Sequence, residues 1–292
     1  MERREFLTLN ATLAAVFIGG YTLKRYTRTE LLRLHELGCE TYEHLEEEAI
    51  GEIRQADIKD HLDIENGAPP EPIIASNEEL STLKAVQGKL AAVSRYVGQG
   101  NFNIISFDRA RNVASSAASI GAFTDEQIVY IEALFHRDAR EYGFYGEKVS
   151  SELTFTIDPK DVVKIPGSGH YLYREQSVDV FNKVKKDIGE TIFLTSGVRG
   201  VPKQMYLFLS KTIVCNGNYS EASRSLAPAG YSYHAIGDFD VGKVGLGERN
   251  FTQDFAATRE YEMLMQLGYI AIRYPRGNPF GVYFEPWHVE VV

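Results

Sequence analysis

The first half of the chain repeats charged and apolar residues with a helical period. Leucines recur among many charges over residues 27–55, and apolar residues recur every three or four positions from Asn77 to about Val97. Such spacing places them on one face of a helix, so we expect two helices, the second capped by Asn77. A third helix is predicted to begin at residues 124–126. Residues 61–72, rich in Gly and Pro, read as a loop.

After residue 150 the pattern changes to short apolar runs that are typical of strands. These runs are residues 153–157, 191–195, a run beginning at Phe239, 269–273 and 282–292. Two helical segments, residues 177–188 and 254–267, lie among them. Strands and helices in this irregular order favour an α+β domain over a regular βαβ array. We therefore predict a helical N-terminal region at residues 25–150 and an α+β domain at residues 151–292.

Composition excludes some partners. A chain of 292 residues can bury a full core, and 44% hydrophobic with 24% charged residues is ordinary for a globular protein. The formal net charge of −9 argues against nucleic acid, whose phosphates need a basic face. The two cysteines, Cys39 and Cys215, form no Cys-x-x-Cys pair, so a thiolate zinc site is not expected.

The N-terminus predicts export. Arg3 and Arg4 precede Phe-Leu and a weakly apolar run over residues 7–21, a pattern typical of a twin-arginine signal. The run is shorter than the ~20 residues of a spanning helix. Residues 1–24 are therefore expected to be a signal or a membrane anchor, which places the protein in the periplasm or cell envelope. An amphipathic first helix is the alternative.

Two histidines near the C-terminus carry the candidate chemistry. His234 is followed by Asp238 and Asp240, and His288 is preceded by Glu285 at a spacing of three. Two imidazoles and a carboxylate are a common ligand set for catalytic zinc, and a nearby glutamate suits a general base. On a strand, residues of even separation share a face, so the pattern does not choose between Asp238 and Asp240.

Four ordered segments extend this pattern. They are Leu194-Thr195-Ser196-Gly197-Val198-Arg199 with Gln204; Pro228-x-Gly230-Tyr231-Ser232-Tyr233-His234-x-x-Gly237 with Phe239-Asp240-Val241; Gly268-Tyr269 through Arg273-Tyr274-Pro275; and Glu285-Pro286-Trp287-His288. In this order they resemble the VanY-related D-alanyl-D-alanine carboxypeptidases of the LAS group of zinc peptidases. The resemblance spans about residues 171–292 and implies a small antiparallel-sheet zinc peptidase domain.

The resemblance also implies roles for individual residues. It assigns Zn²⁺ to His234, Asp240 and His288. Glu285 would be the base that acts on a zinc-bound water, and Arg199 would stabilise the oxyanion that develops on the scissile carbonyl.

The same resemblance implies a substrate. Ser232 would bind the terminal carboxylate of a peptidoglycan stem peptide, and Gln204 would contribute to the substrate pocket. The expected reaction is release of terminal D-alanine, with a cell-wall endopeptidase or a D,D-dipeptidase as alternatives. A non-catalytic wall-binding protein is a further alternative, against which the presence of Glu285 and Arg199 argues.

The chain departs from the family pattern at two places. The family has its aspartate seven residues after the histidine, whereas Asp240 follows His234 by six, so Asp238 stays an alternative ligand. Val198 stands where the family commonly has Tyr, which leaves the fine substrate preference open.

Overall fold

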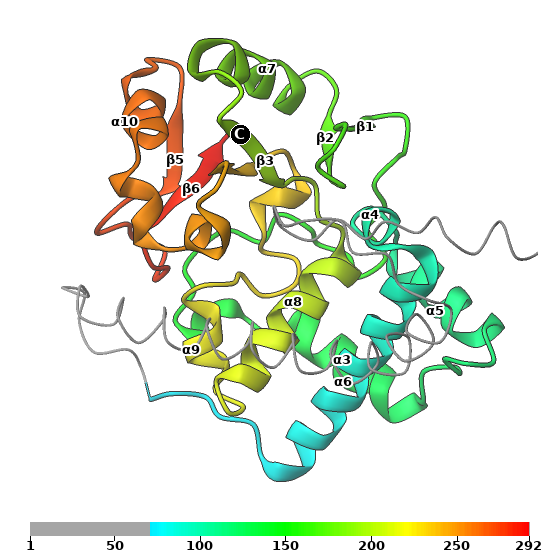
Figure 1. Ribbon diagram of the computed structural model, residues 1–292. Helices are drawn as coiled ribbons and strands as arrows, with labels where there is room; N and C mark the ends of the chain where they lie inside the picture. The colour runs from blue at the N-terminus through cyan, green and yellow to red at the C-terminus, as the bar shows by residue number, and fades with distance from the viewer. Residues whose placement is uncertain (1–70, 292) are drawn as a thin grey trace, which may run out of the picture. The chain divides into compact units, whose positions relative to one another are not determined.

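A four-stranded antiparallel sheet carries the C-terminal half of the protein (Figure 1). The computed structural model describes residues 71–291. The strands, in spatial order, are β3 (Ile192–Ser196), β4 (Phe239–Lys243), β6 (Glu285–Glu290) and β5 (Ala271–Tyr274). A separate hairpin pairs β1 (Val162–Lys164) with β2 (Tyr171–Tyr173).

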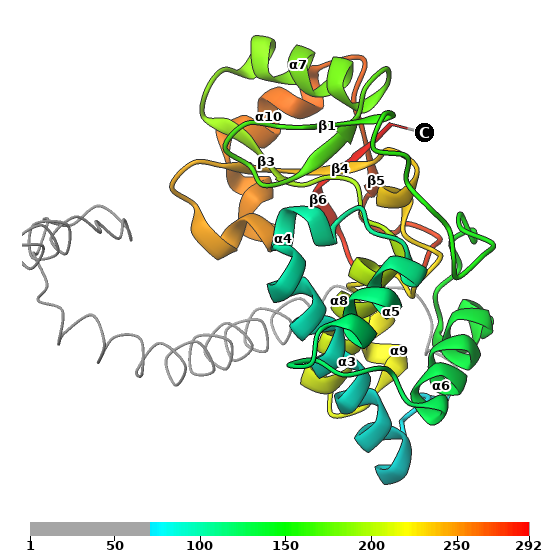
Figure 2. The ribbon, with the colours of Figure 1, turned by 90° about the vertical axis from the view of Figure 1, so that its right-hand side faces the viewer.

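The other regular elements of the described structure are helices. The α-helices are α3 (Asn77–Val97), α4 (Gln99–Phe102), α5 (Phe107–Ser116), α6 (Asp125–His136), α7 (Ser177–Ile188), α8 (Val201–Val214), α9 (Tyr219–Ser223) and α10 (Arg259–Gln266). Short 3-10 helices are η2 (Ala139–Tyr142), η3 (Tyr233–Ala235), η4 (Gly247–Phe251) and η5 (Gln253–Ala257). In both ribbon views α7 and α10 lie with the sheet, while α3, α6 and α8 group together (Figures 1 and 2).

Helix α3 forms where its apolar period predicts. The side chain of Ser76, rather than the expected Asn77, caps the helix by accepting from the backbone N–H of Glu79. The buried face consists of Leu83, Val86, Leu90 and Val93. Each of these side chains contributes about 1.5–3 kcal/mol when fully buried. Packing of this face therefore stabilises the helix more than its cap does.

A first hydrophobic core joins the N-terminal helices to a later segment of the chain. Met205, Phe208 and Leu209 of α8 are buried in the same cluster as the inner face of α3. Figure 2 shows α8 beside α3. The helical core therefore reaches across residue 150 into residues 201–231, and the proposed domain boundary at 150/151 stays a prediction.

A second core lies between the sheet and its helices. Leu194, Val241 and Val289 come from three neighbouring strands, and Phe181 of α7 and Leu264 of α10 pack against them. The strands bury alternate residues on this face. The intervening residues of β4 and β6 therefore point to the opposite face, where the candidate site lies.

The α+β fold with its small antiparallel sheet and helical N-terminal region is confirmed. The strand predicted at residues 153–157 is wrong, because no strand pairs with this segment. Its alternating Leu153 and Ile157 are buried in two different clusters, which explains the strand-like pattern. The helix predicted at residues 254–267 is divided at Thr258, which caps α10.

Several predictions concern residues outside the described part of the chain. The signal at residues 1–24, the helix at 27–55 and most of the loop at 61–72 are among them. Within residues 71–291, no helix has the length and apolar character needed to cross a membrane.

Candidate active site

Strand register brings two of the predicted ligands together. Asp240 of β4 and His288 of β6 are direct partners across the antiparallel pair. Opposite residues on neighbouring strands have side chains on the same face, with Cβ atoms about 4.5–5.5 Å apart. Carboxylate and imidazole meet there, with 3.4 Å between Asp240 Oδ1 and His288 Nδ1.

His234 reaches the same point from a turn. It lies in η3 between β3 and β4, before the strand that carries Asp240, so strand alternation does not relate the two residues. Its Nδ1 lies 2.9 Å from the carbonyl oxygen of Gly197. That contact directs Nε2 to Asp240 Oδ2, at 3.3 Å. The backbone of the β3–α8 connection therefore fixes the ring.

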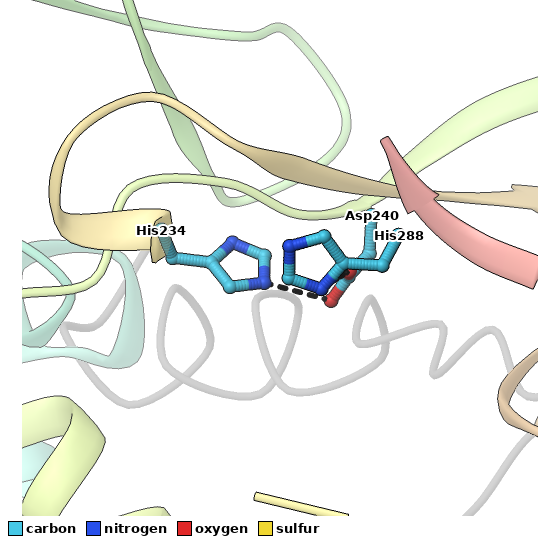
Figure 3. Close-up of side chains that lie close together, drawn as sticks. All are labelled: His234, Asp240 and His288. Carbon is cyan, nitrogen blue, oxygen red and sulfur yellow. Dashed lines mark ion pairs between the residues drawn. The ribbon is translucent and has the colours of Figure 1, made fainter. Parts of the chain in front are cut away.

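The three side chains form a buried group that fits a metal ion (Figure 3). One ligand atom from each of His234, Asp240 and His288 lies within 4.8 Å of the others. His234 Nε2 and Asp240 Oδ1 are buried and have no hydrogen-bond partner. Buried polar atoms of this kind are rare unless a water or an ion satisfies them. Two imidazoles and one carboxylate are a zinc donor set.

Arg199 lies against this group. Its Nη2 donates to Asp240 Oδ2 at 2.7 Å, and its Nε donates to the hydroxyl of Ser196 at 2.9 Å. The register of β3 shifts between Leu194 and Ser196, at a bulge that changes how the end of the strand faces its partner. The guanidinium is thus held by two contacts beside the candidate ligands.

Glu285 completes the buried group. One carboxylate oxygen lies 3.3 Å from His288 Nδ1. Burial raises the pKa of Glu285 above the ordinary value, and the charge of Asp240 adds to this, while His288 opposes it. A carboxyl whose pKa is raised towards neutrality is suited to accept and return a proton.

The pKa values of the other titratable members of the group are shifted in different directions. Burial alone would raise the pKa of Asp240, but His234, Arg199 and His288 together hold it below the ordinary range. Burial and the charge of Arg199 lower the pKa of His234 to about 4, so this imidazole is neutral and able to act as a ligand. His288 differs: burial lowers its pKa, yet Asp238, Glu285 and Asp240 raise it to about 10.

Five of the seven predicted site residues are thus linked by direct contacts: His234, Asp240, His288, Glu285 and Arg199. The other two predicted residues, Ser232 and Gln204, lie close to His234 and Arg199 in sequence, but no hydrogen bond or ion pair joins either side chain to this group in the described structure. Ser232 is buried at the start of the η3 turn. Gln204, on α8, donates from Nε2 to the carbonyl of Ala227 at 2.7 Å, and its buried Oε1 has no partner.

Three further residues lie near the site, outside the seven predicted ones. Asp238 contacts His288 on the side away from Asp240. His170 lines a cavity of about 750 Å³ together with Thr195 and Asn250, and its pKa is lowered to about 4 by burial, Arg199 and Lys203. Burial and Arg199 lower the pKa of Lys203 to about 8. No motif marks His170 or Lys203; only Asp238 had a signal, the short spacing after His234.

A buried His-Asp-His group with an adjacent glutamate and arginine defines a metallopeptidase type of site. Residues 173–292 match a family model described as VanY, D-alanyl-D-alanine carboxypeptidase. Over these residues the chain is similar to the VanY-like zinc metallopeptidases.

Solved structures resemble the chain more distantly. VanYB in complex with D-Ala-D-Ala is 21% identical, with coverage of 51% of this chain and 84% of VanYB and a TM-score of 0.39. The LD-carboxypeptidase LdcB is 23% identical over 47% of this chain and 70% of its own, also with a TM-score of 0.39. A mutant VanY D,D-pentapeptidase in complex with Zn(II) is 21% identical over 45% and 78%, with a TM-score of 0.34. Comparison with curated proteins found no significant match.

Proposed function

We propose that this protein is an exported zinc-dependent D,D-carboxypeptidase that releases terminal D-alanine from peptidoglycan stem peptides. The observation that carries the proposal is the position of Glu285, whose carboxylate lies 3.3 Å from a ligand atom of the His-Asp-His group. A purely structural metal site has no use for such a base.

In this proposal His234, Asp240 and His288 hold the zinc ion. When bound, zinc supplies a Lewis acid that polarises the scissile carbonyl and makes water more acidic. Glu285 removes a proton from the attacking water as its oxygen forms a bond to the carbonyl carbon. The same carboxyl returns the proton to the nitrogen of D-alanine as the C–N bond breaks, so that the amine leaves neutral.

Arg199 would stabilise the negative charge that develops on the carbonyl oxygen. A guanidinium held by two hydrogen bonds is oriented before the reaction, and such groups contribute most of their effect in the transition state. The mutual proximity of Arg199 and Asp240 keeps this donor at the edge of the metal group.

Positive charge beside the site supports exo-cleavage. Lys203, on the first turn of α8, is close enough to Arg199 for that charge to lower its pKa. Among residues 71–291 no carboxylate pairs with Lys203. A substrate with a free terminal carboxylate would compensate this charge, and Ser232 would add a hydrogen bond to it.

A digest of a stem pentapeptide by the full chain, followed by mass spectrometry, tests the proposal. Loss of one D-alanine is the expected result. Loss of a dipeptide, or cleavage within a crosslinked muropeptide only, would instead indicate the dipeptidase or the endopeptidase. Glu285→Gln should lower the rate by about 10²–10⁴-fold. This variant should still bind zinc, and full activity would rule out Glu285 as the base.

Export is proposed on the sequence pattern at residues 1–24, which lie outside the described structure. Fractionation of cells that express the full chain is expected to find it in the envelope. Replacement of Arg3 and Arg4 by lysine should retain the protein in the cytoplasm. Unchanged fractionation of this double variant would refute the twin-arginine route.

A further inference from the structure

His288 is held from both sides. Its Nδ1 faces Asp240 at 3.4 Å, while its Nε2 lies 3.2 Å from Oδ2 of Asp238. Asp238 precedes β4 and is completely buried, two residues before Asp240. The imidazole ring therefore lies between two carboxylates that come from one short segment.

The acceptor sites of Asp238 are already occupied. Oδ1 accepts from Nη2 of Arg273 at 3.1 Å and from the backbone N–H of Val291 at 2.9 Å. Oδ2 accepts from Nε of Arg273 at 2.8 Å, in addition to its contact with His288. A carboxylate offers about four lone-pair sites, and these four contacts use them.

Asp240 differs in this respect. Its Oδ2 meets Arg199, but its buried Oδ1 has no hydrogen-bond partner. Its carboxylate also belongs to the group whose ligand atoms lie within 4.8 Å of one another, whereas Asp238 does not. One aspartate of the pair thus has an acceptor available for a metal, and the other has none.

We infer that Asp238 is not a zinc ligand but the positioning residue that holds His288 as one. By accepting from Nε2–H, Asp238 would fix the tautomer in which Nδ1 carries the lone pair directed at the metal. Arg273 would in turn hold the Asp238 carboxylate through two parallel hydrogen bonds. This role rests on the zinc site of the proposed function.

Zinc affinity of the metal-free full chain, measured by competition with a chromophoric chelator, tests the inference. Asp238→Asn is expected to weaken zinc binding by about 10- to 100-fold, the usual effect of removing such an outer partner. The visible spectrum of the Co²⁺-loaded variant, at saturation, should match that of the wild type, because the ligand set is unchanged. Asp240→Ala should lose zinc binding, and it should not give the wild-type Co²⁺ spectrum.

Each alternative gives a different result. Wild-type zinc affinity in Asp238→Asn would overturn the positioning role alone. An altered Co²⁺ spectrum in Asp238→Asn, with binding preserved in Asp240→Ala, would make Asp238 the ligand. Unchanged binding in all variants, including His234→Ala, would instead refute the proposed zinc site itself.

Two further variants control for folding. Glu290→Gln removes a partner 3.1 Å from Nη1 of Arg273 without touching Asp238 or His288, and should leave zinc affinity unchanged. The double variant Asp238→Leu with Arg273→Met removes both members of the buried ion pair together, and only Glu290, whose side chain is 37% exposed, loses its arginine partner. It should fold, as judged by circular dichroism, and show the same loss of zinc affinity. A folded double variant with wild-type affinity would also refute the role of Asp238.

Discussion

The guanidinium of Arg199 and the carboxylate of Asp240 form a hydrogen-bonded ion pair of 2.7 Å, with both side chains largely removed from solvent. One group thus has two separable effects. Its cation partly offsets the charge of a candidate ligand, and in the proposed reaction its donors would stabilise the scissile carbonyl oxygen.

Arg199→Gln separates these effects. Because an oxyanion donor acts in the transition state, kcat is expected to fall by about 10²–10³-fold with little change in KM. Zinc affinity should stay equal or increase, since a cation beside the site is removed. Steady-state kinetics and chelator competition measure the two quantities. A loss of zinc affinity that parallels the loss of kcat would contradict this division.

Gly197→Ala should damage the site through the backbone. An added Cβ would approach the carbonyl oxygen of Tyr171 more closely than Cβ atoms do in real structures, so the chain must shift. Overpacking of this kind costs about 1–3 kcal/mol. Because the Gly197 carbonyl contacts His234, zinc affinity should fall too. Gly268→Ala, where the new methyl group meets nothing within 4 Å, is the matched control for the melting temperature and the zinc titration.

Removal of zinc should lower the stability of the protein. A ligand that binds only the folded state at 100 times its Kd contributes about 2.7 kcal/mol. Thermal unfolding with and without a chelator should therefore differ for the wild type and for His136→Ala, which changes an exposed histidine of α6. In Asp240→Ala, thermal unfolding should be the same with and without the chelator. A chelator effect that persists in Asp240→Ala would place the metal elsewhere.

His170 should make the protein less stable in mild acid. Burial, with the charges of Arg199 and Lys203, lowers its pKa from 6.5 to about 4. Between these values the unfolded chain binds a proton that the folded protein does not, so stability falls as the pH drops from about 6.5 to about 4.

Urea unfolding at pH 7 and pH 5 measures this effect. In His170→Gln, the free energy of unfolding should change less between the two pH values than in the wild type. His136→Gln should keep the wild-type dependence. An identical pH dependence in His170→Gln would show that this imidazole does not resist protonation.

Much of the fold follows from local patterns. The period of Leu83, Val86, Leu90 and Val93 specifies α3, and alternation specifies β3 and β4. The segment at residues 153–157 has the apolar and polar alternation of a strand but forms none. Its buried residues Leu153 and Ile157 belong to two different clusters. Burial produces the same pattern there as strand pairing, and only the tertiary structure separates them.

The site was predictable where a motif fixes both residue type and spacing. The Glu285–His288 spacing is of this kind, and the structure brings both residues to the predicted group. The choice between Asp238 and Asp240 could not be predicted from the sequence. It depends on hydrogen bonds to Asp238 from Arg273 and Val291, which lie far along the chain. No motif marked Lys203, although it follows Arg199 by only four residues, and His170 comes near Arg199 through packing between distant segments.

Helix α8 belongs to two parts of the molecule at once. Arg199 lies just before its first turn, beside Asp240, while Met205, Phe208 and Leu209 are inside the helical core. A fragment cut at residue 173, where the family match begins, would lack α3, whose buried face belongs to the same core as these three side chains. Fewer residues therefore suffice to recognise the family than to complete the core in which α8 is packed.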